Sequence, residues 1–169
     1  MAKALRYRLF GMGKMPDALK EAAASPDVVL ADEGLVVHNR VASLRMPGAR
    51  VSGGVRTASG AVVILPGRLL ASIGTYVIVD TGLDDKGEAG GQHVLTLAED
   101  GVRIRFEVAT VLRQGSGTVN VNYKLPLDPS VLARLPAREL HVTLSHAAEA
   151  FLNPWRGSYG GGGRQKAPA

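Results

Sequence analysis

The sequence predicts a mainly β protein, in which an antiparallel sheet is strongly bent or closed into a small β-barrel. One observation is that apolar and polar residues alternate along several segments, as in strands with one buried face. A second is that glycine and proline turns separate these segments and leave no room for crossover helices. The chain has 169 residues, of which 46% are hydrophobic and 21% charged, enough for one domain with a substantial core.

The first half of the chain is expected to hold a short helix followed by hairpins. The helix is predicted over residues 16–24, with a proline in its first turn and Leu19 and Ala22 or Ala23 facing inward. Six strands follow, at residues 28–30, 35–45, 49–57, 61–65, 68–73 and 75–79. Their turns are expected at residues 32–34, Pro47-Gly48, Ser59-Gly60, Pro66-Gly67 and Gly74.

The second half has the clearest alternation, and it predicts strands at residues 93–97, 102–108, 118–125 and 140–145. An Asp100-Gly101 pair is typical of the hairpin turn that joins the first two of these. Residues 129–135 are helical or irregular, and a short C-terminal helix is expected at residues 147–152, ending before Pro154. Residues 84–91 are expected to form a mobile surface loop.

These elements divide the chain into three parts. Residues 1–27 form an N-terminal extension with its helix, residues 28–153 the antiparallel β domain, and residues 154–169 a glycine-rich tail that we expect to be disordered.

The amino-acid composition excludes several kinds of reactive site and of binding partner. The absence of cysteine excludes disulfides, thiolate metal sites and cysteine nucleophiles, and no pattern predicts a metal site or a cofactor. The net charge of +5 resides mostly in the tail, where Arg156, Arg164 and Lys166 have no acidic neighbour, so the body of the protein is not predicted to bind nucleic acid. Weak nucleic-acid binding through the tail remains an alternative. No transmembrane segment or signal peptide is apparent, and we expect a cytoplasmic protein.

Asp80-Thr81-Gly82 is the most pointed catalytic motif, because an apolar strand ending in these residues resembles the active-site turn of retropepsin-like aspartic proteases. Such an enzyme would use Asp80 in a homodimer. Two features argue for a polar turn at a strand end instead. The motif is followed by Leu83 rather than a small residue, and the supporting apolar-apolar-glycine segment is missing downstream.

Arginine offers a binding function. Arg45 and Arg50 flank the Pro47-Gly48 turn and should approach each other at the mouth of the hairpin, with Arg56 further along. Guanidinium groups placed in this way hold phosphate or carboxylate groups well, although they also occur as solvated charges that protect a sheet edge.

The stretch from Asp32-Glu33-Gly34-Leu35 through Ser59-Gly60-Ala61-Val62 to Arg68-Leu69-Leu70-Ala71 resembles bacterial pleckstrin-homology-like (PH-like) and GRAM-like domains. The resemblance covers residues 32–72. It implies a bent antiparallel barrel closed by a C-terminal helix, without catalytic activity of its own. It also implies a binding or assembly module for a protein, a peptide or an acidic headgroup, the last of which could belong to a peripheral membrane surface. On this reading Arg45, Arg50 and Arg56 are the expected ligand contacts, and the oligomeric state is open.

Overall fold

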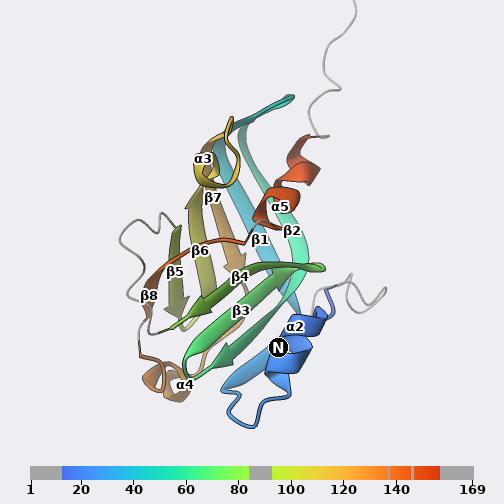
Figure 1. Cartoon of the computed structure of the whole chain (residues 1–169). Coiled ribbons are helices and arrows are strands. Elements are labelled where there is room, and N and C mark those ends of the chain that lie inside the picture. The colour runs from blue at the N-terminus through green and yellow to red at the C-terminus, as the bar shows by residue number, and fades with distance from the viewer. Residues whose placement is uncertain (1–12, 84–92, 137, 146, 157–169) are drawn as a thin grey trace, which may run out of the picture.

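The structure is a computed structural model that describes residues 13–83, 93–136, 138–145 and 147–156. Its main feature is an eight-stranded antiparallel sheet with the order β4-β3-β2-β1-β7-β6-β5-β8 (Figure 1). The elements in chain order are α2 (Asp17–Ala23), β1 (Leu30–Met46), β2 (Ala49–Leu65), β3 (Arg68–Ile73), β4 (Tyr76–Gly82), β5 (His93–Ala98), β6 (Gly101–Glu107), α3 (Val108–Val111), β7 (Ser116–Tyr123), α4 (Pro129–Ala133), β8 (Glu139–Val142) and α5 (Ala147–Arg156).

The two ends of the sheet meet, so that the sheet is nearly closed. Val79 of β4 forms an isolated antiparallel bridge with Leu144, just beyond β8. Beside it the Ser145 amide donates to the Ile78 carbonyl at 3.1 Å. The predicted mainly β fold with a barrel-like antiparallel sheet is therefore confirmed.

The strands β1 and β2 are each 17 residues long and form one extended hairpin, which corrects two predicted breaks. The expected turn at residues 32–34 is a β-bulge, where the register with β2 shifts between Glu33 and Leu35 and Gly34 has a φ of 70°. A glycine tolerates this left-handed backbone, so the strand continues through it.

The expected turn at Ser59-Gly60 is also absent, because Gly60 lies inside β2 opposite Leu35. A Cβ atom built on Gly60 would lie 2.2 Å from the carbonyl oxygen of Ser72 on the neighbouring strand β3. Glycine is required here by the close approach of two backbones rather than by a chain reversal.

The strands of the second half agree with the predicted ones to within a few residues, and Gly101 adopts a φ of 143° after Asp100. The four-residue helix α3 was not predicted. Helix α5 runs to Arg156, so the prediction that it ends before Pro154 is wrong. We attribute the extra turn to Trp155, which is 2% exposed and whose burial outweighs the hydrogen bond lost at the proline.

The core lies on the inner face of the sheet and extends to α5, which packs against β4 and β2. A smaller cluster on the outer face joins Leu19 and Ala22 of α2 to Ala61, Val63 and Leu70, as expected for the inward face of the first helix. None of the helices in the described residues has the length and apolar content needed to cross a membrane. The tail was predicted to begin at residue 154, but residues 154–156 belong to α5. The predicted loop at 84–91 and residues 157–169 of the predicted tail lie outside the described residues.

Candidate functional site

The outer face of β1, β7 and β6 carries rows of polar and basic side chains. Neighbouring strands place their outward side chains in rows, since register partners share a face of the sheet. Each row takes one residue from β1, one from β7 and one from β6: Arg40, Asn120 and Arg105 in the first, and His38, Asn122 and Arg103 in the second. We call these six residues, together with Lys124, which directly follows β7, the basic face.

The cations of the basic face are only partly neutralised. Arg103 donates to the carboxylate of Asp100, which lowers the pKa of that carboxyl group, and Lys124 lowers it further through its charge. Among the described residues Arg40 and Arg105 form no ion pair, and both are exposed. Two free guanidinium groups therefore stand on either side of Asn120.

A hollow of about 580 Å³ lies on this face and is lined by Arg40, Ala42, Asp100, Arg103, Asn120, Asn122, Tyr123 and Lys124. Cations outnumber the one acidic residue in this lining, and two carboxamides offer both hydrogen-bond donors and acceptors. The arrangement suits a ligand that presents acidic groups to the arginines and amide or hydroxyl groups to the asparagines.

The structure brings Arg45 and Arg50 together as predicted, because they are direct register partners across the β1–β2 hairpin. Both are exposed, whereas the flanking Leu44, Met46 and Val51 face the core. Like charges that face each other directly repel, so an anion between them would relieve the repulsion.

Arg56 does not join this pair. It is half-buried opposite Asn39, whose side chain is 2% exposed, and its guanidinium carbon lies 4.7 Å from the centre of the Trp155 ring. Arg56 thus attaches α5 to the inner face of β2 through a cation–π contact. Its side chain lies on the other side of the sheet from Arg45 and Arg50.

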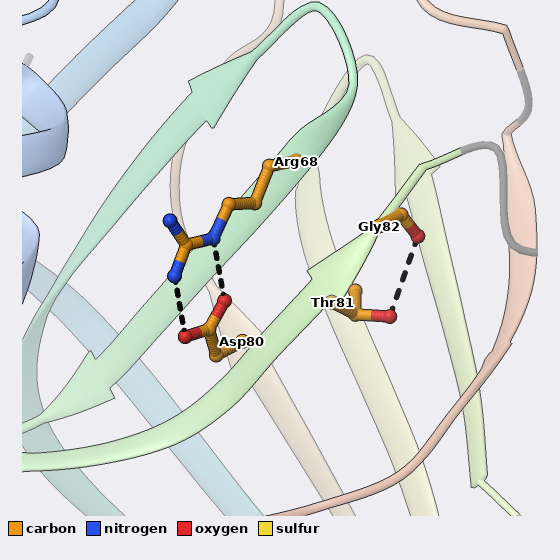
Figure 2. A network of polar contacts seen from close by, with 4 residues as sticks. All are labelled: Arg68, Asp80, Thr81 and Gly82. Atoms are coloured by element: carbon orange, nitrogen blue, oxygen red, sulfur yellow. Dashed lines mark hydrogen bonds and ion pairs between the residues drawn. The ribbon is translucent and has the colours of Figure 1, made fainter.

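Asp80 lies near the end of β4, where its side chain is exposed and forms an ion pair with Arg68. Its two carboxylate oxygens accept hydrogen bonds from Arg68 Nε and Nη2, both at 2.7 Å, and the hydroxyl of Thr81 donates to the Gly82 carbonyl at 3.3 Å (Figure 2). The pair is exposed, and the bond to Asp80 raises the pKa of Arg68. Asp80-Thr81-Gly82 thus forms part of a paired strand and a surface ion pair.

The described ranges contain no group of three or more histidine and acidic side chains placed to hold a metal ion. His93 is buried, contacts the edge of the Phe106 ring and lies 3.2 Å from the Thr110 hydroxyl through Nε2. Burial lowers the pKa of His93, because desolvation disfavours the charged imidazolium.

Comparisons with known proteins identify no relative that has this site. The chain matches no family model, no curated protein and no solved structure. The function is therefore inferred from the arrangement of side chains alone.

Sequence reasoning missed the basic face, although part of its signal is present. Arg103 and Arg105 occupy alternate polar positions of one predicted strand, and Asn120 and Asn122 do so in another. What the sequence did not reveal is that β7 lies between β1 and β6, which is the arrangement that places Arg40 in the same row.

Proposed function

We propose that the protein is a non-enzymatic binding module of the PH-like type, and that its basic face binds an acidic segment of a partner polypeptide. The observation that carries the proposal is the row formed by Arg40, Asn120 and Arg105, in which two guanidinium groups without an ion pair among the described residues flank a carboxamide. Supporting the PH-like assignment, the barrel is nearly closed and α5 packs across β4 and β2, as the resemblance implies.

A polypeptide suits this face better than a lipid headgroup does. The asparagine amides can exchange hydrogen bonds with peptide groups, while the arginines take up aspartate or glutamate side chains. Val55 is the register partner of Arg40 on the outer face. It is the one large apolar side chain beside the row that is highly exposed in the described chain, so this face offers little apolar surface to insert into a bilayer.

Binding of a short glutamate-rich peptide, measured by isothermal titration calorimetry, tests the proposal. A glutamine-rich peptide of equal length, inorganic phosphate and phosphatidylserine vesicles serve as comparison ligands. Since an exposed ion pair contributes about 0.2–1 kcal/mol, the loss of both arginines should weaken affinity by roughly two- to thirtyfold. The affinity should also fall as salt is added, because the face is open to solvent.

The test variant is the double substitution Arg40→Ala and Arg105→Ala. The matched control is Lys14→Ala with Arg134→Ala, which removes the same charge from exposed positions outside the basic face. Equal losses in both variants would reduce the effect to net charge and refute the site. Binding of vesicles without binding of the peptide would replace the polypeptide with a membrane surface.

A further inference from the structure

Among the described residues, the outer half of β2 is a strand edge without a neighbouring strand on one side. β2 pairs with β1 along its whole length, but its pairing with β3 covers Gly60 to Leu65 alone. Just beyond that region the Gly74 amide donates to the Ser59 carbonyl at 2.8 Å. The Ser59 carbonyl therefore points away from β1, toward the side on which β3 lies. Within the ranges that the structure describes, residues 49–59 therefore have a strand on one side only.

Backbone groups of alternate residues in a strand point to the same side. The amides and carbonyls of Gly53, Val55 and Thr57 thus point away from β1, in the direction of the Ser59 carbonyl. Within the described part of the chain, no strand or loop hydrogen-bonds to them. Such a row of open donors and acceptors is a template for another extended strand.

Side chains along this edge leave it accessible on its outer face. Val55 is 62% exposed, the highest value among large hydrophobic residues in the described chain, and Gly53 and Thr57 are exposed on either side of it. On the inner face Arg56 is already held against Trp155. The edge thus combines an exposed apolar centre with small or polar flanks.

We propose that β2 pairs with β2 of a second copy of this chain, antiparallel and centred on Val55. In this register Val55 faces the partner's Val55, and Gly53 faces the partner's Thr57. All three open residues then find partners, with about six backbone hydrogen bonds between the two strands. Each Val55 covers the other, which removes the exposed apolar side chain from water.

This register also keeps the arginine side chains of the two strands from facing each other directly. Arg56 falls opposite the partner's Gly54, so two guanidinium groups never face each other directly. The two sheets join into one, and the basic faces of the two copies lie on the same side of it. The three strand spacings between Arg40 and the partner's Arg40 amount to about 14 Å.

The natural absence of cysteine makes the register directly testable with single-cysteine variants. At the centre of the proposed pair the Cα atoms of Val55 and the partner's Val55 are about 5.5 Å apart, within the range a disulfide spans. Thr57 and the partner's Thr57 are offset by four residues along the strands, which places their Cα atoms about 14 Å apart, too far for a disulfide. Val55→Cys should therefore form a disulfide-linked dimer roughly tenfold faster than Thr57→Cys under the same oxidant.

Sedimentation velocity of the wild-type chain over a range of concentrations provides the second measurement. The proposal predicts a monomer–dimer equilibrium that Val55→Lys abolishes and that Tyr76→Lys, at the other exposed large hydrophobic position, preserves. The proposal would be overturned if the wild-type chain stays monomeric, or if the two cysteine variants cross-link equally fast. The β2 edge would then have to pair with a strand other than β2 of a second copy. The inference is independent of peptide binding, because the variant lacking Arg40 and Arg105 should still dimerise.

Discussion

Gly60 gives the sharpest test of how the barrel is built, through the substitution Gly60→Ala. A Cβ atom at this position would lie 2.2 Å from the Ser72 carbonyl oxygen and 3.0 Å from both Tyr123 Cε1 and Val37 Cγ2. Carbon and carbonyl oxygen normally meet at about 3.3–3.6 Å, so the strands β2 and β3 would have to separate locally. Because one obstacle is backbone and the other two are core side chains, no single side chain can move aside to make room.

Overpacking of a core costs about 1–3 kcal/mol, and the backbone contact places Gly60→Ala at the upper end of that range. Gly53→Ala is the matched control, since it lies on the same strand with no atom within 4 Å of the added Cβ, and it should gain about 0.4–1 kcal/mol from a less flexible unfolded chain. The two variants should thus differ by about 3.4–4 kcal/mol in the free energy of unfolding. For a chain of this length that difference corresponds to roughly 7–16 °C in Tm.

Urea unfolding followed by the fluorescence of the single tryptophan, Trp155, measures this difference, and circular dichroism provides an independent second probe. A Gly60→Ala variant as stable as wild type would refute the close approach of β2 and β3. It would instead favour the flexible turn that the Ser59-Gly60 sequence suggests.

Three further substitutions probe separate parts of the structure. Burial lowers the pKa of His93 from 6.5, so below that pH the unfolded chain binds a proton more readily than the folded chain does, and the free energy of unfolding should fall as the pH drops. Urea titrations at several pH values should show a weaker pH dependence of the free energy of unfolding in His93→Gln. Asp80→Asn should cost less than about 1 kcal/mol because its pair with Arg68 is exposed, and a pepstatin-sensitive cleavage lost in this variant would contradict our assignment of a surface ion pair. Tyr123→Phe removes a buried hydroxyl that has no hydrogen-bond partner among the described residues, so chemical denaturation should show stability unchanged or raised by about 1 kcal/mol, and a clear loss would reveal a bound partner.

Local alternation predicted the strands well because each strand of the barrel has one buried face. Val119, Val121 and Tyr123 are buried while Asn120 and Asn122 are half-buried, which is the period of two that the sequence displays. Where both faces are covered, the pattern becomes a continuous apolar run. Residues 61–64 of β2 are fully buried in this way, between the inner core and α2.

The failures share a physical cause, namely that glycine has several uses which look alike in a sequence. Gly34 permits a bulge and Gly60 permits a close backbone contact, yet both look like turn residues beside short polar segments. Only the pairing of strands far apart in the chain distinguishes these uses. The same dependence on distant pairing hid the row of Arg40 and Arg105, which lie 65 positions apart in the sequence and are joined through β7.

The inner face of β1, β7 and β6 stabilises the fold, whereas their outer face is the one that we propose binds the ligand. On the inner face Val41, Val119 and Phe106 form a buried row, whereas the next row on the outer face holds Arg40 and Arg105 in solvent. Removing an exposed arginine that has no partner changes stability by about 0.5 kcal/mol or less, so the outer row can be altered while the inner row maintains the fold. A loss of peptide binding in the double arginine variant, measured beside an unchanged unfolding curve, can therefore be assigned to recognition rather than to unfolding.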